Sequence, residues 1–237
     1  MTHSQTAGIV LLLGALSASS ASAQDTAAPY QLSVIQEHVL RDSRGVLVFG
    51  PDSVEFKTPA TKDARQWPYR DIKQLQIRST TRLDILTYED QGGLKMGADR
   101  TVEFKVSEGE VTPELVTFLF ERTTRPIVTA VLPVQREEPS FRSNVKHQRQ
   151  GKGSEGTLAV YRSGVAYATD RGGASRYWPL SDLYSVLRLD RFRLEVVAYE
   201  GGSGETRPYV FELKTEMPEG AFRALWEGVN GTRHRPY

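Results

Sequence analysis

The sequence contains no cysteine and only four histidines, and its charges nearly cancel, with 30 Lys and Arg against 29 Asp and Glu in 237 residues. The missing cysteine excludes disulfide bonds, thiolate metal ligands and a cysteine nucleophile. A net charge of +1 gives no broad positive field, so nucleic acid is not an expected partner. The histidines lack a zinc-binding spacing, and no Gly-x-Ser-x-Gly nucleophile motif occurs. We therefore predict no metal, no cofactor and no catalytic residue.

Long apolar runs are also scarce. The run at residues 10–16 is followed by small residues that end in Ala21-Ser22-Ala23, a pattern typical of a signal-peptidase site. It is too short to cross about 30 Å of hydrocarbon, which takes ~20 residues. We therefore expect residues 1–23 to be a cleaved signal peptide, with an uncleaved anchor as the alternative. The protein is then expected to be exported, to a bacterial periplasm or out of the cell.

The sequence repeats itself at an offset of 111 residues. Between positions 45 and 89, twelve residues are identical to those 111 positions later, without a gap. Beyond residue 89 the offset falls to 107, where Phe104 matches Phe211. We predict two copies of one domain, at residues 28–125 and 139–237, joined by a linker at 126–138. The apolar segment 127–131 within this linker is an alternative edge strand for either copy.

Both copies show the same order of predicted elements. A hairpin comes first, at residues 45–58 and 156–169, and a third strand follows a polar loop, at 67–77 and 178–189. Later strands alternate apolar and polar residues, as in Val102-Glu103-Phe104.

Each copy ends in a predicted amphipathic helix. In the second copy, Asn230-Gly231 is the expected end of the helix. The residues at helical spacing there are Phe222, Leu225, Trp226 and Val229. Antiparallel strands followed by one helix predict an α+β fold. We expect two repeated, mostly antiparallel β-barrel or bent-sheet domains, each capped by its C-terminal helix.

This layout resembles pleckstrin-homology-type (PH-like) domains, especially the bacterial PH and GRAM-like variants. The resemblance is carried by the hairpin that begins at Gly45 and Gly156, by the Trp-Pro-x-x-Asp segments, and by the final helix. It implies a seven-stranded bent sheet capped by a helix, used to bind lipid head groups, peptides or protein partners. The first hairpin turn holds Pro51-Asp52-Ser53 instead of basic residues, and its counterpart offers a single Arg162, so a phosphoinositide site is not expected.

The repeated Trp-Pro-x-x-Asp segment supplies the first candidate site. Trp67 and Trp178 could line a groove beside Asp71 and Asp182 that binds a ligand or a protein partner. The structural interpretation is that tryptophan packs at the sheet edge, proline begins a strand and aspartate accepts backbone N–H bonds in the turn. Two arginine pairs also recur, Arg65/Arg176 and Arg82/Arg193. They are expected to form ion pairs with Asp71/Asp182 or Glu89/Glu200 and not to contact a ligand.

A second candidate site is basic. The second copy carries 15 basic and 11 acidic residues, a net charge of +4, and part of this excess lies in residues 142–152. The residues of this basic stretch are Arg142, Lys146, His147, Arg149 and Lys152. They could meet an anionic membrane surface or a polysaccharide, or they could form a solvated strand between the domains.

These observations lead to three functional hypotheses. The first is an exported, non-catalytic binding module that takes a protein or peptide partner in the cell envelope, at a sheet edge or groove. The second is peripheral attachment to anionic lipid or polysaccharide through residues 142–152. The third is a hydrolase with a site between the domains that uses Asp71, Asp182 or the histidines.

Overall fold

The computed structural model describes residues 30–38, 41–90, 98–148, 153–200 and 204–233. The predicted signal peptide, Arg149, Lys152 and most of the glycine-rich turns lie outside the described residues.

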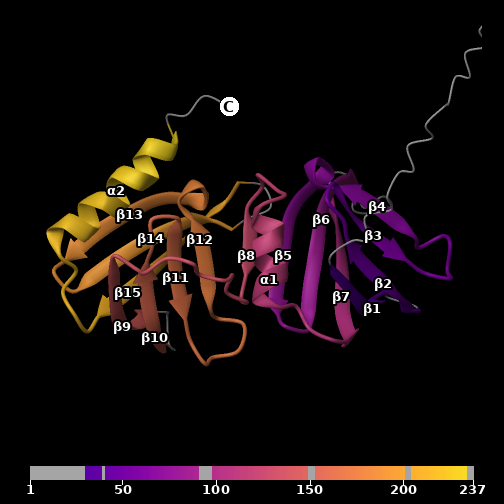
Figure 1. Cartoon of the computed structure of the whole chain (residues 1–237), viewed down its shortest axis with the longest axis horizontal. Helices are drawn as coiled ribbons and strands as arrows, with labels where there is room; N and C mark the ends of the chain where they lie inside the picture. Colours follow the sequence, from indigo (N-terminus) through magenta and orange to yellow (C-terminus); the bar gives the residue numbers. More distant parts are fainter. Residues whose placement is uncertain (1–29, 39–40, 91–97, 149–152, 201–203, 234–237) are drawn as a thin grey trace, which may run out of the picture.

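Two antiparallel sheets follow one another along the chain, and each is built from one sequence repeat (Figure 1). Unit 1, residues 30–129, contains β1 (Tyr30–Gln36), β2 (Ser43–Phe49), β3 (Ser53–Lys57), β4 (Arg65–Pro68), the 3-10 turn η1 (Tyr69–Asp71), β5 (Ile72–Ser79), β6 (Arg82–Asp90), β7 (Asp99–Glu108), α1 (Pro113–Phe120) and β8 (Ile127–Thr129). Unit 2, residues 141–233, contains β9 (Phe141–Gln148), β10 (Ser154–Val160), β11 (Gly164–Ala168), β12 (Arg176–Pro179), η3 (Leu180–Asp182), β13 (Leu183–Asp190), β14 (Arg193–Tyr199), β15 (Thr206–Leu213) and α2 (Glu219–Arg233).

The two sheets share one topology. Seven strands in each sheet follow the same order, β4-β3-β2-β1-β7-β6-β5 in unit 1 and β12-β11-β10-β9-β15-β14-β13 in unit 2, and β8 extends the first sheet beyond β5. Each order is linear among the described strands, so neither sheet closes into a barrel, and no strand of one sheet enters the other. This confirms the predicted α+β class with two bent sheets, and the layout fits a PH-like fold.

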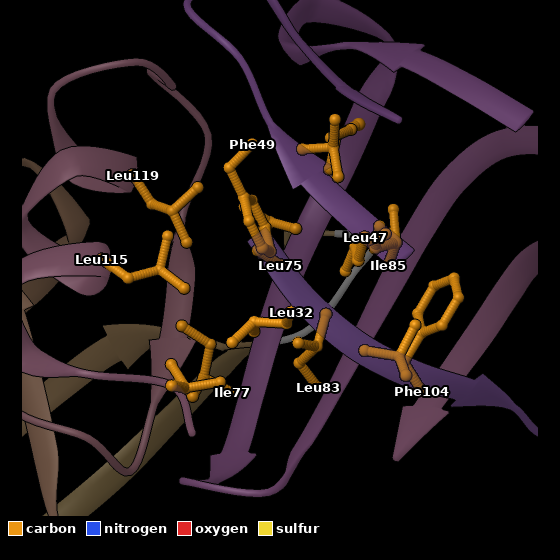
Figure 2. Close-up of a cluster of buried hydrophobic side chains, with 14 of the residues drawn as sticks. Leu32, Leu47, Phe49, Leu75, Ile77, Leu83, Ile85, Phe104, Leu115 and Leu119 are labelled. Carbon is orange, nitrogen blue, oxygen red and sulfur yellow. The ribbon is translucent and has the colours of Figure 1, made fainter. Parts of the chain in front are cut away.

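Each unit buries its own hydrophobic core. In unit 1 the inward residues of the strands meet Leu115 and Leu119 of α1, whose side chains point into the cluster in Figure 2. Pro113 begins α1, and the hydroxyl of Thr112 accepts the N–H of Leu115, as expected for a helix N-cap. In unit 2 the corresponding cluster includes Leu225 of α2. The helices therefore complete the two cores, as amphipathic helices do.

Two predicted elements differ from the structure. The third strand is not continuous, because the Trp-Pro-x-x-Asp segment ends one strand, makes a 3-10 turn and begins the next. Helix α2 continues through Asn230-Gly231 to Arg233, and Trp226, predicted on its apolar face, is 48% exposed. Within the described ranges, no helix has both the length and the apolar character needed to cross a bilayer.

Strand β8 comes from the predicted linker. It pairs parallel to β5, with Ile127 opposite Leu75 and Thr129 opposite Ile77, so the edge-strand alternative holds for unit 1. Ile127 and Thr129 are buried. On its other side β8 contacts β12 of unit 2. The connector therefore completes one sheet and places it against the other.

Some residues that the two copies share stabilise the hairpins and loops and do not belong to the hydrophobic core. Gly45 and Gly156 lie where a Cβ atom would overlap the carbonyl oxygen of Lys57 or Ala168 across the hairpin. Arg65 donates to the carbonyls of Lys62 and Ala64, and Arg176 makes the equivalent bonds to Gly173 and Ser175. The identities of the repeat thus have a structural cause in both units.

We predict that Gly45→Ala and Gly156→Ala each lower the free energy of unfolding by about 1–3 kcal/mol, because the added methyl group forces the hairpin apart. Chemical denaturation followed by tryptophan fluorescence measures this change. Gly172→Ala is the matched control, since a Cβ atom at Gly172 meets no atom within 4 Å. Equal stability of the two hairpin variants and the control would contradict the prediction.

Candidate functional site

The Trp-Pro-x-x-Asp corner places its tryptophan in the core of each unit. Trp67 and Trp178 are each 3% exposed. Trp67 meets Phe104 edge-on at 6.3 Å between ring centroids, and Trp178 meets Phe211 in the same way at 6.4 Å. Both indoles therefore fill equivalent core positions, and neither lines an open groove.

The two aspartates of this corner lie in different surroundings. The side chain of Asp71 is 60% exposed, and its carboxylate lies 3.8 Å from the Arg70 guanidinium. Asp182 is 8% exposed and accepts a hydrogen bond from the Ser181 hydroxyl at 3.1 Å. It also accepts the backbone N–H of Ile127 in β8. The structure does not bring Asp71 and Asp182 together in one site.

Burial changes the acidity of Asp182. Removal from water disfavours the carboxylate and raises the pKa of Asp182 to about 6, while the bonds from Ser181 and Ile127 act in the opposite direction. Among the described residues, no salt bridge reaches this carboxylate. Asp182 is thus a buried acid at the seam between the units.

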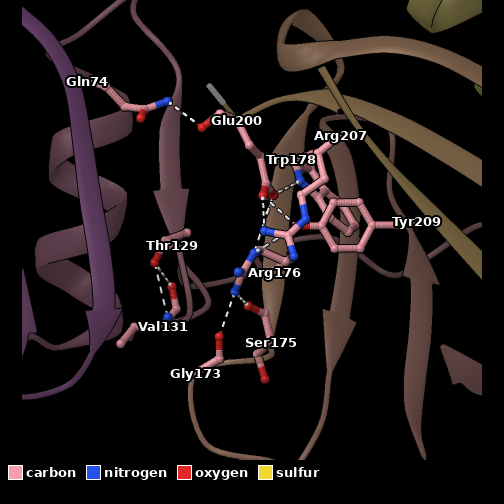
Figure 3. Close-up of polar contacts among 10 residues, drawn as sticks. All are labelled: Gln74, Thr129, Val131, Gly173, Ser175, Arg176, Trp178, Glu200, Arg207 and Tyr209. Carbon is pink, nitrogen blue, oxygen red and sulfur yellow. Dashed lines mark hydrogen bonds and ion pairs between the residues drawn. The ribbon is translucent and has the colours of Figure 1, made fainter. Parts of the chain in front are cut away.

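A second buried carboxylate, Glu200, lies close to this seam (Figure 3). It accepts the indole N–H of Trp178 at 2.9 Å and the hydroxyl of Tyr209. Its oxygens lie 3.3 Å from the Arg176 guanidinium and 3.8 Å from that of Arg207. The Glu200 side chain is only 5% exposed, whereas that of its repeat partner Glu89 is 50% exposed and pairs with Arg100. Of the predicted ion pairs, Arg176–Glu200 is therefore present, whereas Arg82 pairs with Glu37 and Arg193 with Asp190.

The seam itself combines polar and aromatic contacts. The Gln74 side-chain amide donates to the Glu200 carbonyl at 3.2 Å, and Phe120 of α1 packs edge-on against Tyr177 at 5.4 Å. Two cavities open along the seam, of about 630 and 570 Å³. The arginines of the larger cavity already have carboxylate partners, since Arg78 pairs with Asp84 and the other two pair with Glu200. The smaller cavity includes Asp182 in its wall.

The described part of the basic stretch is not a continuous positive surface. Residues alternate inward and outward along β9, so Arg142 and Lys146 point to solvent while His147 is buried, 3% exposed. His147 packs against the rings of Tyr209 and Phe211, both at 5.2 Å. Lys146 lies opposite Glu155 on one neighbouring strand and Glu212 on the other. Acidic neighbours thus offset its charge.

A cluster of exposed apolar side chains escaped the sequence analysis. Each member is 46–47% exposed, and all lie on β13 or in the turn after it. We call this set the β13 face: Tyr184, Leu187, Leu189 and Phe192. The sequence predicted a strand at 178–189 but did not indicate which of its apolar residues face solvent. Within the described part of the chain, no group of three or more potential metal ligands occurs.

Comparison with known proteins adds little. No protein-family model matches the sequence, and no curated protein gives a significant match. One similar solved structure is the C-terminal domain of an unknown protein from Leishmania infantum, with 12% identity, a TM-score of 0.31 and coverage of 40% of this chain and 85% of that chain. Another is the Spt16D Pob3N heterodimer, with 10% identity, a TM-score of 0.30 and coverage of 80% and 97%. Likenesses at this level carry no argument about function.

We predict that Asp182→Asn raises the free energy of unfolding by about 1–3 kcal/mol at pH 7.5. The folded-state pKa of Asp182, about 6, lies above the ordinary value of 3.8, so the folded state holds the proton more tightly than the unfolded chain does. The wild-type protein therefore loses stability as the pH rises from about 4 through 6, and the variant escapes this loss. Denaturation at several pH values tests this, and an advantage that persists unchanged at pH 3.5 would contradict it.

We also predict that Glu200→Ala lowers the free energy of unfolding by about 3–5 kcal/mol, because it leaves the largely buried Arg176 without its counter-charge. Glu89→Ala, at the equivalent exposed position, should cost less than about 1 kcal/mol. Thermal and urea denaturation of both variants give the comparison. Similar losses at the two positions would show that burial does not distinguish them.

Proposed function

We propose that this chain is an exported, non-catalytic protein-interaction module of two PH-like units, and that unit 2 docks a protein partner in the cell envelope through the β13 face. The observation that carries the proposal is the equivalence between this face and an interface inside the chain. Leu187 lies opposite Glu195 just as Gln76 lies opposite Asp84, one repeat earlier. The β13 face therefore corresponds to the outer face of β5 and β6.

In unit 1 that outer face is covered in part, since the side chain of Arg78 remains 56% exposed. Gln74 bonds to the Glu200 carbonyl of unit 2 and is only 1% exposed, and Asp84 is 4% exposed. Gln76 and Arg78 line the larger cavity at the same seam. The fold thus uses this surface for docking in unit 1 and leaves its counterpart in unit 2 open.

The two equivalent faces differ in chemistry. Unit 1 presents Gln76 and Arg78 where unit 2 presents Leu187 and Leu189. Large apolar side chains exposed along one strand and its turn are unfavourable in water unless another surface covers them. The matching partner is a protein that presents an apolar strand or sheet face, and burying half of each large side chain contributes on the order of 1 kcal/mol.

A second copy docked head to tail fits this face poorly. The receiving surface of unit 2 is formed by small and aromatic residues, among them Ala166 and Tyr177, and Phe120 packs on it. The equivalent positions in unit 1 are Glu55 and Gln66. A copy that offered these polar side chains would leave the apolar β13 face mismatched, so a different protein is the favoured occupant.

Site-directed crosslinking tests the proposal. A photo-crosslinking amino acid at Leu187 should capture a partner in envelope extracts, whereas the same group at Tyr88, exposed to 48%, should not. The partner is then purified, and its affinity is measured by calorimetry. We expect the double variant Leu187→Glu/Phe192→Glu to bind at least tenfold more weakly, and Tyr88→Glu to bind normally.

Two outcomes would contradict the proposal. One is a partner whose affinity is unaffected by the double variant. The other is a purified chain that forms dimers in sedimentation velocity and becomes monomeric with the same variant, since the occupant would then be a second copy. Export is tested separately, by mass spectrometry of the protein from its own cells: an amino terminus at Gln24 is expected, and a retained Met1 would contradict cleavage.

A further inference from the structure

The smaller seam cavity has the dimensions of a ligand site. It lies between the end of α1, the segment 133–137 of the connector and the η3 corner of unit 2. Its volume of about 570 Å³ falls within the range of about 300–1,000 Å³ that holds small ligands. The β13 face does not contribute to its walls. The cavity is therefore a separate feature from the docking face.

The wall of this cavity contains one buried carboxylate. The Ser181 hydroxyl and the Ile127 backbone N–H donate to Asp182, and a carboxylate has about four acceptor positions. Acceptor capacity thus remains beyond the two donors. At the equivalent corner of unit 1, Asp71 is largely exposed, and water stabilises its charge. Unit 2 instead keeps an acid at a position where burial raises its pKa.

The rest of the lining combines apolar and charged side chains. Phe120, Val134 and Tyr177 supply the apolar surface. The charged and titratable groups that face the cavity, besides Asp182 and Tyr177, are Glu121, Arg125, Arg136 and Glu137.

Most of these charges are already engaged elsewhere. Glu137 accepts hydrogen bonds from the backbone and hydroxyl of Ser163, and Glu121 lies 3.6 Å from the Arg122 guanidinium. The guanidinium of Arg125 lies 5.7 Å from the ring of Tyr88. Among the described residues, no salt bridge joins Asp182 to Arg125 or Arg136.

We propose that this cavity binds an ammonium group carried on an apolar stem, with the Asp182 carboxylate as its counter-ion and Phe120 and Tyr177 packed against the stem. An ammonium group brings three hydrogen-bond donors. It also brings a positive charge, which would balance the negative charge of the buried carboxylate. Two sources share this chemistry: a free alkylamine, and a lysine side chain of a protein. The segment that bears the ammonium would lie against η3 and the connector, so occupancy would link the two units.

Binding is measured by NMR, using the backbone amides of Ile127 and Asp182 as reporters, with n-pentylammonium and a capped lysine tripeptide as probes at pH 7.5. We expect saturable shifts with at least one probe and none with n-pentanol, which has the stem without the charge. Binding should weaken about tenfold at pH 5, where Asp182 is mostly protonated. Shifts from the amine alone identify a small-molecule ligand, and shifts from the tripeptide alone identify a protein lysine.

Asp182→Asn should weaken binding at least tenfold, and the matched variant Asp71→Asn should leave it unchanged. Circular dichroism confirms that both variants fold. Failure of both probes to bind, or equal binding by Asp182→Asn and wild type, would overturn the proposal. The double variant Leu187→Glu/Phe192→Glu should bind the probes normally, so loss of the docking function and loss of this site can be told apart.

Discussion

The parallel pairing of β8 with β5 is the contact on which the arrangement of the two units depends. A free strand edge exposes unpaired backbone groups, and β8 satisfies those of β5 between Leu75 and Ile77. Because β8 also contacts β12, the segment that closes unit 1 brings it against unit 2. The Ile127 N–H then reaches Asp182. The short strand β8 therefore covers the edge of β5, contacts unit 2 and lies next to the buried Asp182.

That seam explains why identical residues of the repeat differ in behaviour. Asp71 and Asp182 occupy the same corner, yet only Asp182 faces the connector. Glu89 remains in solvent, while Glu200 is enclosed by Trp178 and Tyr209. Burial of a charge is unfavourable unless it is hydrogen-bonded or paired, and Glu200 has both kinds of partner whereas Asp182 has hydrogen bonds alone. The two carboxylates that differ most from their counterparts in unit 1 thus lie at the seam, where the units contact each other.

The sequence allowed the α+β class, the repeat and α1 to be predicted, because glycine, proline and strand alternation act locally. It could not show that His147 is buried, since the charge count of the basic stretch ignored the inward position of every second residue on β9. It could not separate Asp71 from Asp182 either, because their difference depends on a strand from outside the repeat. It could not show the exposure of Leu187 either, because a strand pattern does not tell which face of the strand another surface covers.

The two copies of the repeat do not share the apolar residues of the β13 face. The seam face of unit 1 carries Gln76 and Arg78 where unit 2 carries Leu187 and Leu189. Polar residues suit a seam that holds together through Gln74 and the Glu200 carbonyl within a single chain, where the connector keeps the units at high effective concentration. A partner that arrives from solution has no such tether, and its association must draw on apolar burial. The proposed docking of a partner on the β13 face would account for the divergence of the two faces.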